Sequence, residues 1–283
     1  MFSLSHHANL DLSVLKQLLQ VTALLTKRGW FDAADTNSDD MNQGENALSP
    51  VLSQLPKLLA AGVESQIVGG RLLSMLTDEF SFTRASAVGL AWEQHLHSRV
   101  GFEQVALPQV FSEVVKMLGQ HERMAAEFNV PSRKSVYNDW MAVWLATLTT
   151  ILTWEFEQDG GQRDLFSLPP RGVETEPALL QPGLAWRNAL TDGRLVELLL
   201  SIASTMLKIS DPDIASRPRQ ALLALCNLDG AIFSTKQTRT AFHSDFLLRV
   251  LVWLNTAVAV AVSAASMDEE LVAGQVTKVD YCS

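Results

Sequence analysis

The sequence predicts an all-α fold without a β-sheet. Apolar residues recur at helical spacing along most of the 283-residue chain, whereas the alternation of apolar and polar residues that is typical of strands is rare. Most of the predicted connections are short, which suits antiparallel neighbouring helices. The helices also pair at intervals of roughly forty residues, as in HEAT-like solenoids, and about four to five pairs are expected. Because no strict sequence period is present, this pattern by itself leaves a closed all-helical domain as the alternative.

The composition narrows the possible classes of function. Hydrophobic residues make up 47% of the chain and charged residues 19%, which is enough apolar material for a substantial core. The formal net charge of −9 disfavours nucleic-acid binding, which needs clustered lysine and arginine, and favours partners with a basic surface. Cys226 and Cys282 form neither a disulfide framework nor a zinc-binding pattern, which suits a reducing compartment. We expect Cys226 to be a small buried hydrophobe.

The first predicted helix ends at Gly29, after the basic pair Lys27-Arg28, which is a typical C-terminal signal. Its predicted apolar stripe consists of Leu12, Leu15, Leu18, Leu19, Thr22 and Leu25. The polar stretch 33–47 is rich in Asp and Asn and predicts a loop insert. Helix resumes near Pro50, because proline is tolerated in a first turn. The first residues, MFSLSHHANL, lack the basic segment of a signal peptide.

Further helices are predicted at about 63–79, 84–98, 104–119, 132–157, 193–208, 213–228 and 240–265. The Gly- and Pro-rich segment 159–183 predicts a long connection between repeats, the best place for a functional loop. The apolar stretch 250–265 is shorter than the about 20 residues that a membrane span needs, so it predicts a buried helix and no membrane insertion. The polar residues 266–283 are expected to form a C-terminal tail.

The stretch GLAWEQHLHSRVGF, residues 89–102, raises the question of a metal site. Residues two apart diverge by about 200° on a helix, so His95 and His97 cannot both reach one ion. We therefore expect a packing helix on which Glu93 and His97 share the wetter face, with contact to a partner as the alternative. The residues expected to be partly packed are Leu90, Leu96 and Val100.

A second acidic group could ligate a cation or act as an acid-base pair. It consists of Glu155, Glu157 and Asp159, but the ligand ladder of a calcium loop does not follow it. We expect a solvated helix end instead, anchored by the packing of Trp154 and Phe156. Docking of a basic partner there is the alternative.

The tryptophans at 140 and 144 share one helix face and predict core packing rather than a ligand slot. Burial is predicted for Trp144, Leu148, Leu199 and Leu223, and exposure for 37–46 and 169–178. The chain contains no G-x-S-x-G elbow, Walker A loop or Rossmann fingerprint. We therefore predict no enzyme, no catalytic, cofactor-binding or metal-binding residues and no cofactor. The sequence does not identify which residues would contact a protein partner.

Three stretches resemble, in order and at comparable spacing, the exportin-4 type of nuclear transport receptor in the importin-β superfamily. They are QVTALLTKRGWFD (20–32), LTDEFSFTRASAVGLAWEQHLHSRVGFEQVALPQVF (76–111) and LLQPGLAWRNALTDGRLVELLL (179–200), the last continuing to LDGAIF (228–233). The Glu79-Phe80 pair, the run from Trp92 to His95, and Trp186 with Arg187 are similar to the family's residues.

The resemblance implies an open helical solenoid, armadillo-like or HEAT-like, that forms one partial array over 1–283. It also implies a receptor that shuttles between nucleus and cytoplasm, carries folded protein cargo under control of the GTPase Ran, and can meet nuclear pore proteins. Such receptors are several times longer, and their Ran-binding arch lies largely before the point where Gln20 aligns. We therefore expect weak binding of a basic cargo and no tight binding of GTP-loaded Ran by this chain alone. The alternative is a cytosolic helical-repeat scaffold without Ran coupling.

Overall fold

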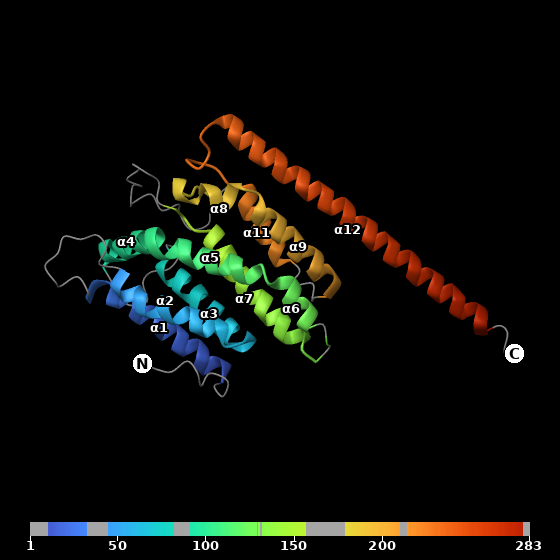
Figure 1. Cartoon of the computed structure of the whole chain (residues 1–283), viewed down its shortest axis with the longest axis horizontal. Helices are drawn as coiled ribbons and strands as arrows, with labels where there is room; N and C mark the ends of the chain where they lie inside the picture. The colour runs from blue at the N-terminus through green and yellow to red at the C-terminus, as the bar shows by residue number, and fades with distance from the viewer. Residues whose placement is uncertain are drawn as a thin grey trace, which may run out of the picture. The chain divides into compact units, whose positions relative to one another are not determined.

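The computed structural model describes residues 11–32, 45–81, 91–128, 130, 132–156, 179–209, 214 and 216–279 (Figure 1). These residues form helices and no strand; one isolated parallel bridge joins Leu180 and Leu228. The chain divides into two compact units, Met1–Ser234 and Thr235–Ser283. The all-α prediction is confirmed.

The first unit contains most of the helices. Its α-helices are α1 (Leu12–Asp32), α2 (Glu45–Ala60), α3 (Val63–Phe80), α4 (Trp92–Gly101), α5 (Leu107–Leu118), α6 (His121–Phe128), α7 (Lys134–Leu152), α8 (Arg187–Thr191), α9 (Arg194–Ile209) and α11 (Arg217–Cys226). A π-helical turn, η4 (Phe102–Ala106), joins α4 to α5, and a 3-10 turn, η5 (Leu184–Trp186), precedes α8. The second unit contains α12 (Lys236–Val279).

Helices α3, α7 and α11 lie side by side and form one layer of the first unit (Figure 1). Helices α1 and α2 pack on α3, α5 and α6 pack on α7, and α9 packs on α11. Trp140 Nε1 donates to Gln66 Oε1 at 2.9 Å and Thr147 Oγ1 donates to the Gly70 carbonyl at 3.3 Å. From the first of these hydrogen bonds to the second, the residue numbers increase on both helices, so α3 and α7 run parallel. Parallel helices that recur one repeat apart are the arrangement of an open solenoid.

The core between these helices contains the predicted aromatic residues. Trp140 and Trp144 of α7 are fully buried and meet edge to face, with ring centroids 6.5 Å apart. Gly70 lets α3 approach them, because a Cβ atom there would lie 2.6 Å from Val143 Cγ1. Leu148 and Leu199 are also fully buried, as predicted.

Helix α1 differs from its prediction in length and in the face it buries. It continues past Gly29 to Asp32, because Trp30 is buried in the core and its packing outweighs the low helix propensity of glycine. Its buried face consists of Leu15, Leu19, Ala23, Thr26, Lys27 and Trp30. The predicted stripe is wrong at its two ends, since Leu12 and Leu25 are 60% and 63% exposed.

Sequence analysis also missed helix α6, which lies between two predicted helices. Its sequence HERMAAEF is short, but it packs on α7 and α9 through the buried Met124 and Phe128. His121 Nε2 lies 3.0 Å from Ser201 Oγ of α9. A helix of this length gains its stability from tertiary contacts, which periodicity over a long window does not detect.

Two residues near the end of α11 contradict the predicted burial. Leu223 is 58% exposed and Cys226 is also exposed. Helix α11 buries Pro218, Ala221 and Leu225 instead, and this face packs on α7 and α9. Leu223 and Cys226 lie off that face.

Helix α12 is apolar over much of its circumference, and its predicted burial is wrong. Exposed large hydrophobic residues are Leu247, Leu248, Leu251, Val252, Leu254 and Val258. The helix also continues to Val279, beyond the predicted end at 265. One side of it is more protected, with Phe246 buried. None of the helices among the described residues is long and apolar enough to span a membrane.

Several predictions fall on residues that the structure does not describe. These are most of the polar insert, the first part of the helix predicted at 84–98, and most of the connection 159–183. Within the insert, Glu45–Ala47 already belong to α2. The predicted exposure of 37–46 and 169–178 also lies outside the described side chains.

Candidate protein-binding groove

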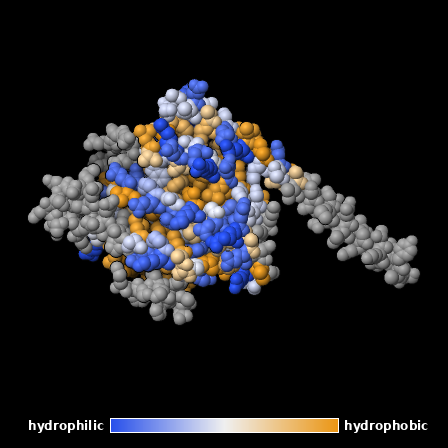
Figure 2. Space-filling view, viewed as in Figure 1, coloured by the Kyte–Doolittle hydropathy of each residue, from blue (hydrophilic) through white to orange (hydrophobic). Residues whose placement is uncertain are grey.

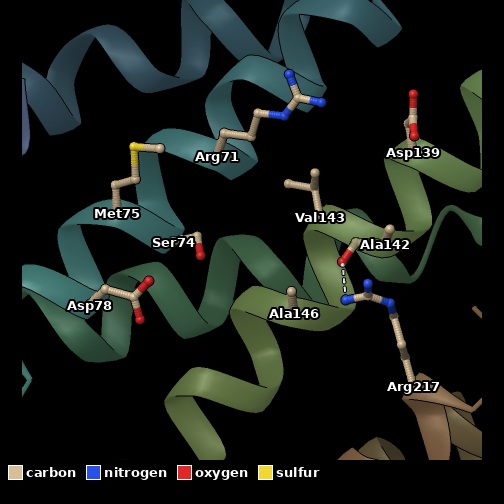
Figure 3. A pocket seen from close by; sticks show the side chains of 9 residues that line it. All are labelled: Arg71, Ser74, Met75, Asp78, Asp139, Ala142, Val143, Ala146 and Arg217. Atoms are coloured by element: carbon tan, nitrogen blue, oxygen red, sulfur yellow. Dashed lines mark hydrogen bonds between the residues drawn. The ribbon is translucent and has the colours of Figure 1, made fainter. Parts of the chain in front are cut away.

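A groove of about 320 Å³ lies on the layer formed by α3, α7 and α11 (Figure 3). It is lined by Arg71, Ser74, Met75 and Asp78 of α3, by Asp139, Ala142, Val143 and Ala146 of α7, and by Arg217 of α11. All three helices belong to the first unit. We call this surface the inner groove.

The sequence of α7 explains why the inner groove is hollow. Asp139, Ala142, Val143 and Ala146 follow the spacing i, i+3, i+4 and i+7, so they share one helix face. The bulky tryptophans of α7 are buried in the core, and the groove face carries mostly small side chains. A helix with small side chains between two neighbours with longer ones leaves a depression along its length.

Charges of both signs surround this depression. Arg71 and Asp78 lie seven residues apart on α3, or about 10 Å along the helix axis at 1.5 Å per residue. Figure 3 shows Asp139 and Arg71 toward one end of the groove and Asp78 toward the other. The Arg217 guanidinium reaches over from α11 and donates to the Ala142 carbonyl at 3.5 Å. The groove can therefore pair with both acidic and basic side chains of a partner.

The histidines of the stretch 89–102 separate on helix α4 as the helical geometry predicts. His97 is exposed, whereas His95 is only 1% exposed. Burial, together with the positive charges of Lys27 and Arg99, lowers the pKa of His95 to about 4. His95 is therefore neutral near pH 7. Among the described residues, no group of three or more His, Cys, Asp or Glu side chains could hold a metal ion.

The cations beside His95 belong to ion pairs inside the fold. Lys27 Nζ donates to the Glu79 carbonyl at 2.5 Å and to Glu79 Oε1 at 3.1 Å. Burial lowers the pKa of Lys27, and the hydrogen bond and charge of Glu79 oppose that effect. Arg99 lies 3.8 Å from Glu103 Oε2, which also accepts a hydrogen bond from the Trp154 ring. This buried charge cluster joins α1, α3, α4 and η4, and its burial is typical of a structural role.

Aromatic rings accompany this buried charge cluster. Phe102 stacks on Phe80 at 4.4 Å between ring centroids and on Trp154 at 5.8 Å. The Lys27 ammonium lies 5.5 Å from the Phe80 ring, and the Arg99 guanidinium lies 5.3 Å from the Trp154 ring. The prediction that Trp154 packs in the core is thus confirmed.

The acidic group at the end of α7 is only partly described. Phe156 is buried, as predicted, and meets Trp186 at 5.3 Å between ring centroids. Glu155 is exposed, as predicted, but it lies past the end of α7 at Leu152 rather than within the helix predicted to run to 157. Glu157 and Asp159 lie outside the described residues, so the proposed cation or acid-base arrangement stays untested.

Sequence analysis did not single out the residues of the inner groove. A weak signal was present, because Ala142 and Ala146 lie four residues apart on a helix whose tryptophans predict a buried opposite side. The contributions of Arg71 and Arg217 carried no such signal. They come from helices far apart in the sequence, and only packing brings them to one surface.

The stacked helices of the first unit define an all-α protein, and their arrangement is consistent with a helical-repeat array. The family model of Exportin-4 matches residues 2–272, so the chain belongs to the Exportin-4 family. Exportin-4 of Dictyostelium discoideum is 22% identical to this chain over 243 residues, which cover 82% of this chain and 21% of the relative. The chain thus spans about a fifth of the length of this curated relative. No solved structure shows a significant match. The resemblance found in the sequence is confirmed.

Proposed function

We propose that this chain is a segment of a nuclear export receptor and that it binds folded protein cargo through the inner groove. The match of the Exportin-4 family over residues 2–272 carries this proposal, because membership in that family points to a nuclear transport receptor rather than to an enzyme. In full-length form the receptor would couple cargo binding to GTP-loaded Ran and move between nucleus and cytoplasm. Contacts with nuclear pore proteins belong to the same proposal.

The inner groove supports cargo binding by its position and by its charges. It draws on three helices of one layer, so a partner there contacts several repeats at once. Asp139 offers a carboxylate to a basic partner, and Arg71 offers a cation for orientation. The net charge of −9 adds long-range attraction toward a basic cargo, which weakens as salt is raised.

Filling the inner groove tests the proposed cargo contact. Ala146→Trp places a large ring among the lining residues, and Ala126→Trp on the exposed side of α6 is the matched control. Each variant would be immobilised, and proteins retained from nuclear extract would be quantified against the unmodified chain. We expect Ala146→Trp to lose partners that Ala126→Trp retains. Equal retention by both variants would exclude the groove as the main contact.

Titration with Ran in its GTP and GDP forms tests the proposed coupling of cargo binding to Ran. We expect no tight binding by the chain alone, and nucleotide-dependent binding once it is placed within a full-length receptor. Sub-micromolar, GTP-selective binding by the chain itself would show a Ran site within these residues. Absence of binding in the full-length context would favour the alternative, a helical-repeat scaffold without Ran coupling.

A further inference from the structure

One end of the inner groove carries two opposite charges that do not pair with each other. Arg71 comes from α3 and Asp139 from α7, and both lie toward the same end of the groove (Figure 3). Arg71 is half-buried and Asp139 is exposed, and neither side chain forms a hydrogen bond or an ion pair with the residues that the structure describes. Each of them can therefore take a counter-charge from a partner.

Beyond this end, the groove is lined mainly by small side chains. Ala142 and Ala146 lie four residues apart on α7, and Ser74 of α3 is also small and half-buried. Small residues at this spacing let the backbone of another helix approach closely. The segment from Asp139 to Ala146 extends about 10 Å at 1.5 Å per residue, or about two helical turns. The groove therefore fits the ridge of an α-helix that lies along it.

The main chain of the groove favours a helix over an extended segment as the occupant. The lining residues of α3 and α7 lie inside helices, where the main-chain groups bond to one another. The Ala142 carbonyl also accepts a hydrogen bond from Arg217. An extended segment in the groove would find few main-chain partners, whereas a helix satisfies its own main-chain groups.

We propose that the inner groove binds a helix of the cargo protein that carries an acidic residue against Arg71 and a basic residue against Asp139, beside small or apolar side chains. This inference rests on the proposed function, because it takes the inner groove as the cargo contact. A helix with basic residues alone would place a like charge against Arg71, and one with acidic residues alone would do so at Asp139. The bound helix therefore needs both charges, and their positions set its orientation.

The surface of the first unit agrees with a partner face of mixed character. Figure 2 shows hydrophilic and hydrophobic residues interspersed over the visible face of this unit. A single helix in a groove of about 320 Å³ makes a small contact, which is typical of weak association. The two charges should accordingly contribute more to selectivity than to affinity.

Two isomeric helical peptides test the proposal, with the whole chain as the receptor. Each is an alanine-rich peptide of about 20 residues that a side-chain staple keeps helical. It carries one Glu and one Lys on opposite flanks of its contacting face, and the second peptide has these two residues exchanged. Because both have the same composition, long-range attraction to the acidic chain affects them equally. In fluorescence anisotropy at low salt, we expect one isomer to bind about three- to tenfold more tightly.

Reversing both groove charges gives the decisive comparison. In the double variant Arg71→Asp with Asp139→Arg, the preference between the isomers should invert, whereas each single reversal should remove it. Arg194→Asp and Asp192→Arg are the matched controls, because these residues pair with each other at 3.5 Å outside the groove. They change the net charge equally and should leave the preference intact. Far-UV circular dichroism would check that all variants keep their helix content.

Equal binding of the two isomers, or binding of neither, would overturn this inference, as would a preference that the double variant retains. The Ala146→Trp variant separates this outcome from failure of the proposed function. If that variant loses cargo while the isomers bind equally, only the helix with two charges is excluded. If it retains cargo while the isomer preference holds, the groove is excluded as the cargo contact and its selectivity for such a helix stands.

Discussion

Lowering the pH should destabilise the first unit through His95, and the direction follows from its surroundings. In the unfolded chain an ordinary histidine has a pKa near 6.5, whereas burial next to Lys27 and Arg99 lowers the folded-state pKa to about 4. Between these two values the unfolded chain binds a proton that the folded chain excludes. Stability is therefore unaffected by this group above the unfolded pKa and decreases as the pH falls through the window toward about 4.

The size of the effect follows from the two pKa values. One pKa unit corresponds to about 1.4 kcal/mol, so the separation between 6.5 and about 4 corresponds to about 3 kcal/mol when the window is fully crossed. A loss of about 3 kcal/mol is a large part of the 5–15 kcal/mol that stabilises a typical domain. The effect should consequently be visible in equilibrium unfolding. His121, whose pKa is also lowered chiefly by burial, should add a contribution of the same sign.

Urea unfolding followed by circular dichroism at a series of pH values between about 7.5 and 4.5 would measure this dependence. His95→Leu removes the titrating ring, and His97→Leu is the matched control on the exposed side of the same helix. Over that range the unmodified chain and the His97 variant should lose about 2–3 kcal/mol more than the His95 variant. The transition of the first unit, which contains α4, should be analysed separately, because the two units need not unfold together.

The reasoning would be refuted if His95→Leu kept the pH dependence of the unmodified chain. That result would mean that His95 is protonated in the folded state at mildly acidic pH. An NMR titration of the His95 ring would decide the question directly, since the folded-state pKa should lie near 4 rather than near 6.5.

Three further predictions concern packing and the buried charge cluster. Leu199→Ala should cost about 2–5 kcal/mol in urea unfolding, whereas Leu223→Ala, at an exposed site, should cost less than about 0.5 kcal/mol. Gly101→Ala would drive its Cβ into the Trp30 ring and should destabilise by about 1–3 kcal/mol, whereas Gly183→Ala meets open space and should be close to neutral. Glu79→Gln removes the carboxylate beside a fully buried lysine and should cost about 3–5 kcal/mol at neutral pH; a change below about 1 kcal/mol would show that the ion pair contributes little.

Much of the fold could be predicted from the sequence because helical periodicity is a local property. The segments that became α3, α9 and α11 were located to within a few residues, and the burial of Trp144, Leu148 and Leu199 followed from their spacing. The spacing also excluded a shared metal site for the two histidines of α4. Family membership was detectable for the same reason, since collinear residues are a property of the chain order.

Which face of a helix is buried was harder to predict when more than one face is apolar. Helix α1 has apolar residues on two sides, and the sequence favoured a stripe that included the exposed Leu12 and Leu25. Contact with α2 and α3 selected the side of Leu15, Leu19 and Ala23. The same ambiguity explains the errors at Leu223, at Cys226 and along α12. Periodicity shows that an apolar face exists, but the position of the neighbouring helix decides whether it is covered.

The sequence by itself determined that this protein is an all-α member of the Exportin-4 family, because both conclusions depend on residue spacing and order along one chain. Only the tertiary structure brought together the residues of the proposed binding surface. The inner groove joins Arg71, Asp139 and Arg217, which are separated by long stretches of sequence and meet through the packing of α3, α7 and α11. The buried charge cluster around His95 likewise depends on α1, α3 and α4 lying together. Burial and electrostatic interactions depend on distances in space, and those distances are set when the helices pack.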